Sequence, residues 1–241
     1  MRLRLLLPRC GGRAELRRDR LSADCDLDWD GCVNARDLGG LPTVDGGVTR
    51  SGALIRSETV DRLSPDGWRA LRAYGVRTII DLREEDELGH PGTAAGPRDG
   101  VETIHIPLDR IADDPEFWDD WMHGPQFGTP LYYAPFVERF PDRLEQVLAA
   151  IEQAPPGGVL FHCVGGRDRT GMVAIAALAA ARVEPEAIAD DYERGAERAH
   201  THDPSLEQFL KERGTSSREL VLDLAASLDL DRPALRRRLA G

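Results

Sequence analysis

Short apolar strands alternate with helical segments along this chain of 241 residues, and this alternation restricts the fold more than any other feature. Residues 76–82 and 158–163 are apolar runs of strand length, and residues 101–107 alternate between apolar and polar side chains. Apolar side chains recur at helical spacing in the intervening segments, for example over 137–151. We therefore predict an α/β fold with a central, mostly parallel sheet flanked by helices.

Several boundaries can be placed within this pattern. Asp45-Gly46-Gly47 predicts an N-terminal hairpin turn, and Ser64 followed by Pro65 predicts the start of a helix that ends at Gly75. Pro141 must kink or restart the helix over 137–151. The remaining helical segments that the spacing predicts are 170–182, 184–198, 204–213 and 217–239.

The N-terminal residues have a different composition from the rest of the chain. Seven arginines fall within the first twenty residues, and the apolar run 5–7 is too short for a signal peptide. We predict a disordered basic extension over 1–28 and a single domain over 29–241. The longest apolar run, 171–183, is shorter than the ~20 residues of a membrane span, so no integral membrane segment is expected.

The charge balance restricts the partners of the protein. With 42 acidic and 31 basic residues, the formal net charge is −11, which disfavours nucleic-acid binding. A phosphorylated partner would need a local positive site against this field. The four cysteines form no CxxC pair and no disulfide framework, which favours a reducing compartment, and we expect a cytoplasmic protein.

The segment 158–182 combines the features of an anion site. Cys163 ends a predicted buried strand, Gly165 and Gly166 allow a tight loop with inward N–H groups, and a helix follows from Thr170. Arg169 can present its planar fork to two oxygens of a tetrahedral anion. The same features favour the thiolate form of Cys163, placed for attack on a bound phosphate.

Polar residues also follow the other predicted strands. Asp81 ends one strand, and Asp109 closely follows another. Because ligands of parallel sheets bind beyond the carboxyl ends of the strands, we expect both side chains near Cys163.

The loop resembles the signature of the cysteine-based protein tyrosine phosphatases, His-Cys-x5-Arg-Ser/Thr. It is most similar to the bacterial tyrosine/dual-specificity branch, whose loop reads His-Cys-x-x-Gly-Lys-Asp-Arg-Thr-Gly. Two further motifs of that branch are present in the same order, Asn-x-Arg-Asp-Leu-Gly-Gly at 34–40 and Asp-Leu-Arg at 81–83. The resemblance spans 34–171 and is weak beyond residue 184.

This resemblance implies hydrolysis of phosphate monoesters without a metal or other cofactor, through a phosphocysteine on Cys163. Thr170 would assist the sulfur as leaving group, and His162 would orient the loop. The residues implied to bind phosphate are Val164, Gly165, Gly166, Arg167, Asp168 and Arg169. The residues expected to support the loop are Arg36, Asp37, Arg83 and Asp109.

An aspartic acid must protonate the leaving oxygen. Asp81 and Asp168 are the two candidates that we place among the catalytic residues, and Asp109 is a third. The alternative for Asp81 is a salt bridge with a neighbouring arginine, and the alternative for Asp168 is to orient the loop through Arg36 or Arg83.

The substrate could be a phosphorylated protein, above all phosphotyrosine, or a phosphoinositide or inositol phosphate. Arg167 replaces a lysine that relatives associate with extra negative charge on the substrate, in a chain whose only lysine is Lys211. A catalytically silent phosphate-binding module is the alternative from another class. Intact Cys163, Arg169 and Thr170 disfavour it.

Overall fold

The computed structural model describes residues 25–88, 100–199 and 203–241, so most of the predicted extension 1–28 lies outside the described residues. Of that segment, Leu27 is buried in the core and Asp26 forms ion pairs with Arg194 and Arg198. The centre of the molecule is a five-stranded sheet in the order β1-β2-β5-β3-β4. The strands are β1 (Arg36–Asp37), β2 (Leu54–Ser57), β3 (Val76–Asp81), β4 (Glu102–His105) and β5 (Gly158–His162).

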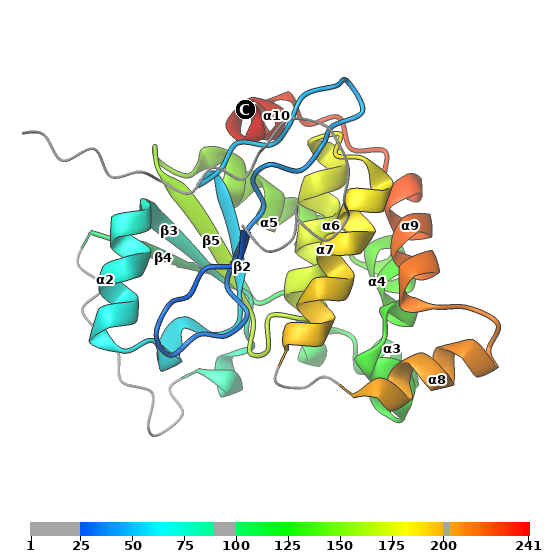
Figure 1. Cartoon of the computed structure of the whole chain (residues 1–241). Coiled ribbons are helices and arrows are strands. Elements are labelled where there is room, and N and C mark those ends of the chain that lie inside the picture. Colours follow the sequence, from blue (N-terminus) through cyan, green and yellow to red (C-terminus); the bar gives the residue numbers. More distant parts are fainter. Residues whose placement is uncertain (1–24, 89–99, 200–202) are drawn as a thin grey trace, which may run out of the picture.

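All neighbouring strands pair in parallel except β1, which is antiparallel to β2. The predicted mostly parallel sheet is therefore confirmed. Helices cover both faces of the sheet, as Figure 1 shows for α2 on one face and α5 and α6 on the other. The helices are α2 (Pro65–Tyr74), α3 (Pro115–Met122), α4 (Tyr133–Arg139), α5 (Pro141–Gln153), α6 (Asp168–Ala180), α7 (Pro185–Arg198), α8 (Pro204–Glu212), α9 (Ser217–Ser227) and α10 (Pro233–Leu239).

Successive residues of the strands contribute to two separate hydrophobic clusters. In β3, Ile79 belongs to the cluster under α2, whereas Ile80 belongs to the larger cluster under the remaining helices. In β5, Leu160 and Phe161 divide in the same way. This division follows from the alternation of side chains along a strand, and it explains why the strands are apolar on both faces.

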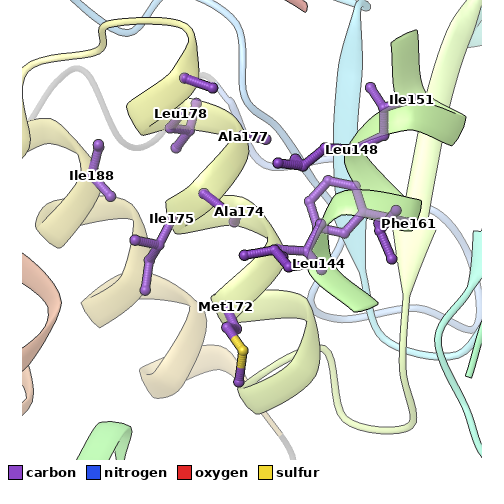
Figure 2. Packing of buried hydrophobic residues seen from close by; sticks show 14 of the residues in the cluster. Leu144, Leu148, Ile151, Phe161, Met172, Ala174, Ile175, Ala177, Leu178 and Ile188 are labelled. Atoms are coloured by element: carbon purple, nitrogen blue, oxygen red, sulfur yellow. The ribbon is translucent and has the colours of Figure 1, made fainter. Parts of the chain in front are cut away.

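The helix α6 lies in the middle of the larger cluster. Figure 2 shows it between Leu148 of α5 on one side and Ile188 of α7 on the other. Nearly all of its side chains are buried, which is the pattern of a helix that is covered all round. The site at its N-terminus is therefore built on a helix that packing holds firmly.

Two predicted helices differ from the observed ones. Helix α6 begins at Asp168 rather than Thr170, so Arg169 and Thr170 lie in its first turn. The predicted helix 217–239 is divided into α9 and α10, because Pro233 has no N–H for a continuing helix and instead starts α10. By contrast, Pro141 restarts a helix as predicted, at the first position of α5.

The predicted hairpin turn forms, but it lies within a long connection. Gly46 has a positive φ of 84°, and Thr43 N donates to Gly47 O at 3.0 Å. The residues beside the turn make single bridges, such as Pro42 with Val48, rather than strands. The paired strands are β1 and β2, further from the turn in sequence.

Candidate active site

The carboxyl ends of β3 and β5 bring the predicted site residues to one edge of the sheet. Asp81 ends β3 and pairs in register with His162, the last residue of β5. Cys163 follows directly, and Asp109 lies just beyond β4. The structure thus places the three residues at the edge where parallel sheets bind ligands.

Three successive carbonyl groups of the 163–169 loop are held by donors from the surrounding scaffold, and so are directed away from the inner side of the loop. The bonds are Thr59 N to Val164 O at 3.0 Å, Asn34 Nδ2 to Gly165 O at 3.3 Å and Arg56 Nη2 to Gly166 O at 2.9 Å. In a trans peptide the next N–H points opposite to the carbonyl. The amides of Gly165, Gly166 and Arg167 therefore face the inner side, as an anion site needs.

Gly166 is a position that only glycine fills without strain. Its φ is +69°, and a Cβ there would lie 2.6 Å from Glu58 N and 2.7 Å from Ser57 O. The loop thus approaches the end of β2 as closely as a backbone can.

Cys163 lies at the base of the loop and is 4% exposed. Thr170 Oγ1 donates to its Sγ at 3.2 Å, which brings together two residues that the sequence predicts to act as a pair. The buried His162 ring interacts through Nδ1 with Cys163 O at 3.0 Å. Burial lowers the pKa of His162, so the ring is neutral near pH 7 and acts as a structural donor.

Arg169 is held in place by an acid that the sequence analysis does not identify. Glu87 accepts from Nη1 at 2.5 Å and from Nη2 at 2.7 Å, in a bidentate pair. Nε lies 3.4 Å from Asp109 Oδ2. Burial opposes the charge of Arg169, but the Glu87 pair outweighs it and raises the pKa further. The sequence signal for Glu87 is only its place in an acidic run after the Asp-Leu-Arg motif.

Asp81 is engaged in a closed ion pair. Oδ1 accepts from Arg83 Nε at 2.9 Å, and Oδ2 accepts from Arg83 Nη2 at 2.7 Å. Arg83 Nη1 also donates to Asp61 Oδ2 at 2.7 Å. Burial raises the pKa of Asp81, but the Arg83 bonds outweigh burial and hold it below its ordinary value. The carboxylate is therefore ionised and fully bonded, which is the structural alternative that the sequence leaves open for it.

Asp109 has the opposite electrostatics. Burial raises its pKa to about 7, although the nearby Arg169 charge lowers it. Its Oδ1 is buried without a hydrogen-bond partner, and Trp118 and Arg143 both donate to its main-chain oxygen. A neutral carboxyl therefore lies against the guanidinium of Arg169 at acidic to neutral pH.

Asp168 is the first residue of α6, within the loop. Its side chain is 31% exposed, and its Oδ1 accepts from Tyr133 OH at 3.3 Å. Burial also raises the pKa of Asp168, against the charge of Arg167. Tyr133 comes from the aromatic segment 117–133, of which Trp118, Tyr132 and Tyr133 are buried in the core.

Arg167 turns away from solvent. The residue is 6% exposed, and Nη2 donates to Gly128 O at 2.5 Å. Its Nε lies 4.0 Å from Asp168 Oδ1. The guanidinium thus ties the loop to the segment Pro125–Gly128.

The predicted supporting residues divide into two groups. Arg36 donates to Asn34 Oδ1 at 2.7 Å and to Asp191 Oδ1 at 2.8 Å, in the layer directly behind the loop. Asp37 instead accepts from Gly39 N, Gly52 N and Tyr74 OH, so it organises the β1–β2 connection. Asp168 contacts neither Arg36 nor Arg83 among the bonds of the described residues; Tyr133 and Arg167 take that place.

Within the ranges that the structure describes, no three His, Cys, Asp or Glu side chains gather so that they could hold a metal ion. The helices of the same ranges include none with the length and apolar character needed to cross a bilayer.

The sequence of this chain is similar to those of known proteins. The family described as "Tyrosine phosphatase family" matches residues 27–239. A protein of Cupriavidus necator named as a tyrosine-protein phosphatase is 31% identical over 173 residues, which cover 69% of this chain and 62% of the relative. A Mycobacterium tuberculosis protein named triple specificity protein phosphatase PtpB is 29% identical over 192 residues, covering 68% of this chain and 67% of that protein. The chain thus spans less than two thirds of the length of the Cupriavidus relative.

A solved structure of P. aeruginosa TpbA in complex with pTyr covers 85% of this chain and 98% of its own. The sequence identity is 20% and the TM-score is 0.39.

Proposed function

The chain belongs to the tyrosine phosphatase family, and we propose that it hydrolyses phosphate monoesters through a phosphocysteine intermediate, with phosphotyrosine in proteins as its preferred substrate. The observation that carries this proposal is the arrangement around Cys163. A thiol in contact with Thr170 lies at the base of a loop that has three successive carbonyls held by the scaffold and an arginine fixed by Glu87. This arrangement suits attack on a bound phosphate.

In the first step, the Cys163 thiolate attacks phosphorus and the bond to the substrate oxygen breaks. Arg169 and the inward amides of the loop hold the equatorial oxygens, where negative charge is spread in the transition state. An aspartic acid gives its proton to the leaving oxygen. The products are the free phenol and a phosphocysteine.

In the second step, the same aspartate takes a proton from water, whose oxygen attacks phosphorus while the S–P bond breaks. The electron pair returns to sulfur, and the Thr170 hydroxyl donates to the departing thiolate. Inorganic phosphate is released, and the aspartic acid regains its proton for the next cycle.

We place this acid at Asp168. It combines a raised pKa with a side chain that is one-third exposed, so it can hold a proton and also reach a bound substrate. Asp81 has both oxygens bonded to Arg83 and stays ionised. Asp109 is the second candidate. Its raised pKa suits a general acid. However, its side chain lies against Arg169, where a carboxyl in the neutral form adds no negative charge beside the bound phosphate.

The position of Arg167 favours phosphotyrosine over phosphoinositides. A substrate with several phosphates needs a second exposed cation, whereas Arg167 is buried and bonded to Gly128. The name of the Mycobacterium relative supports including phosphoserine and phosphothreonine among the substrates to be tested. We also propose a cytoplasmic location, since Cys25, Cys32 and Cys163 form no disulfide within the described residues.

A panel of phosphotyrosine, phosphoserine and phosphothreonine peptides, phosphoinositides and inositol phosphates would test the proposal, with chelator present. We expect turnover that is fastest with phosphotyrosine and absent in Cys163→Ser. Faster turnover of a phosphoinositide would favour the lipid alternative. Binding of phosphate without turnover of any substrate would favour a silent binding module.

A further inference from the structure

Helix α7 supplies a buried carboxylate to the layer behind the 163–169 loop. Building on the proposed function, we propose that Asp191 is a positioning residue that sets the phosphate affinity of the loop, with Gly195 one turn later giving the room it needs. Neither residue belongs to the motifs that identify the loop. Both lie on α7, C-terminal to those motifs.

Asp191 binds two arginines at once. Its Oδ1 accepts from Arg36 Nη2 at 2.8 Å, and its Oδ2 accepts from Arg56 Nη1 at 2.6 Å. Both arginine side chains are 1% exposed, and the Asp191 side chain is 8% exposed. One carboxylate therefore fixes two guanidinium groups that water does not reach.

Each of these arginines is also connected to the 163–169 loop by hydrogen bonds. Arg56 uses its other terminal nitrogen, Nη2, to hold Gly166 O at 2.9 Å. Arg36 Nη1 donates to Asn34 Oδ1 at 2.7 Å, and the Asn34 amide donates in turn to Gly165 O at 3.3 Å. Asp191 thus reaches the two glycine carbonyls whose outward direction turns the next amides toward the phosphate.

The carboxylate is needed because two buried cations repel each other. Removing one partner of a buried ion cluster leaves an uncompensated charge, which the structure relieves by moving or hydrating the group. Without Asp191, Arg36 and Arg56 would have to separate, and the carbonyls of Gly165 and Gly166 would lose their fixed direction. A misplacement of about 1 Å in such a site can cost roughly 100-fold in rate.

Gly195 lies on the same face of α7, four residues after Asp191. A Cβ at this position would lie 2.9 Å from Nη2 of both Arg36 and Arg56. The absence of a side chain lets both guanidinium groups rest against the helix. Alanine would push them away, although its helix propensity is higher than that of glycine.

The same helix offers a matched control. Asp26 also lies between two arginines, Arg194 and Arg198, and its side chain is 13% exposed. Arg198 continues to Val33 O rather than to the loop. Asp26→Asn removes one charge from a similar cluster on α7. Among the described residues, the Asp26 side chain hydrogen-bonds to Arg194 and Arg198 but to neither Arg36 nor Arg56; it acts on Arg36 only through its charge, and its main-chain bridge to Arg36 is kept in the variant.

The experiment compares Asp191→Asn, Gly195→Ala and Asp26→Asn with the wild type. Calorimetry gives the dissociation constant of inorganic phosphate, kinetics give kcat/KM for a phosphotyrosine peptide, and thermal unfolding gives stability. We expect phosphate binding to weaken about tenfold or more in the first two variants, with a loss of up to roughly 100-fold in kcat/KM. Asp26→Asn should lose stability but keep the phosphate affinity.

Unchanged phosphate affinity in folded Asp191→Asn would overturn the proposal. If that variant does not fold, Gly195→Ala decides in the same way. Weakening of the same size in Asp26→Asn would show a general loss of stability and would also overturn it. Phosphate binding does not depend on turnover, so an inactive wild type would count against the proposed function and leave this test intact.

Discussion

Two buried ion triads flank the 163–169 loop, and they have opposite compositions. In the acid-rich triad, Arg83 lies between Asp61 and Asp81. In the arginine-rich triad, Asp191 lies between Arg36 and Arg56. One contains two acids for a single base, and the other contains two bases for a single acid.

This difference decides what each triad can do for the loop. The two carboxylates of the acid-rich triad accept from Nε, Nη1 and Nη2 of Arg83, so all three nitrogens of this guanidinium are used within the triad. The arginine-rich triad has more donors than its carboxylate accepts, and Arg56 uses one of them to hold Gly166 O. A surplus of donors thus lets an ion cluster orient a backbone, whereas Arg83 has no side-chain nitrogen left for the loop.

Breaking the acid-rich triad should have the largest effect, and on stability rather than on catalysis. Asp81→Asn leaves Arg83 paired with Asp61 alone, and the loss of a buried partner should lower the free energy of unfolding by about 3–5 kcal/mol. Because the pKa of Asp81 is lowered in the folded state, its contribution is present at neutral pH and is lost as the pH falls below about 4. The difference from wild type should therefore shrink in acid.

Urea unfolding and kcat per folded molecule would check this expectation. A loss of about 100-fold in kcat at unchanged stability would instead identify Asp81 as the general acid.

The second prediction concerns Asp168, the acid in the loop, which belongs to neither triad. Asp168→Asn should lower kcat by about 100-fold, since a positioned proton donor contributes on the order of 10²–10⁴. Phosphate affinity should be little changed. The wild-type rate should fall as the pH rises through the raised pKa of Asp168, and the variant should lack this fall.

Measurement of kcat against pH would be paired with an aryl phosphate whose leaving oxygen is weakly basic. The defect should be smaller for that substrate, because its oxygen needs less protonation. The same pattern in Asp109→Asn but not in Asp168→Asn would move the acid to Asp109.

The buried carboxyl of Asp109, which belongs to neither triad, should depend on pH in the opposite way to Asp81. Its pKa is raised from 3.8 to about 7. The unfolded chain then binds fewer protons than the folded one, so stability should decline from about pH 4 to about pH 7. One pKa unit is worth about 1.4 kcal/mol. Counting only half of the shift from 3.8 to about 7, we predict that Asp109→Asn is more stable than the wild type by roughly 2 kcal/mol at pH 8.

Unfolding of this variant and of the wild type would be compared at pH 4 and pH 8. A gain that is equal at both values would show that the Asp109 carboxyl has an ordinary pKa.

The smallest effect tests the geometry of the two arginines directly. Arg56→Lys keeps the charge but cannot hold Asp191 and Gly166 O with two separate nitrogens, so phosphate should bind about tenfold more weakly. Arg83→Lys should weaken only its own triad and leave phosphate binding unchanged. Calorimetry would measure the affinity of both variants for inorganic phosphate. An equal loss of affinity in the two lysine variants would contradict the distinction between the triads.

The sequence predicts the sheet, most helices and the base of the site because these depend on local patterns. Apolar runs predict β3 and β5. The short spacing from Cys163 to Thr170 predicts a single loop that leads directly into the next helix. The closed pair of Asp81 with Arg83 is open to prediction too, since the two lie two residues apart on one strand end.

The arginine-rich triad could not be predicted in this way. Asp191 meets Arg36 and Arg56 across 155 and 135 residues, and an acid within a helix normally indicates a solvated face. Glu87 meets Arg169 across 82 residues. Such contacts depend on how whole elements pack, and no local spacing encodes them.

The most direct test of the central claim is to identify the residue that receives the phosphoryl group. Wild-type enzyme would be mixed with a phosphotyrosine peptide in the presence of chelator, quenched within milliseconds and mapped by mass spectrometry. We predict phosphate on Cys163 in the wild type, and neither this adduct nor turnover in Cys163→Ser. A serine variant that turns over at the wild-type rate, or a phosphoryl group on another residue, would contradict the mechanism.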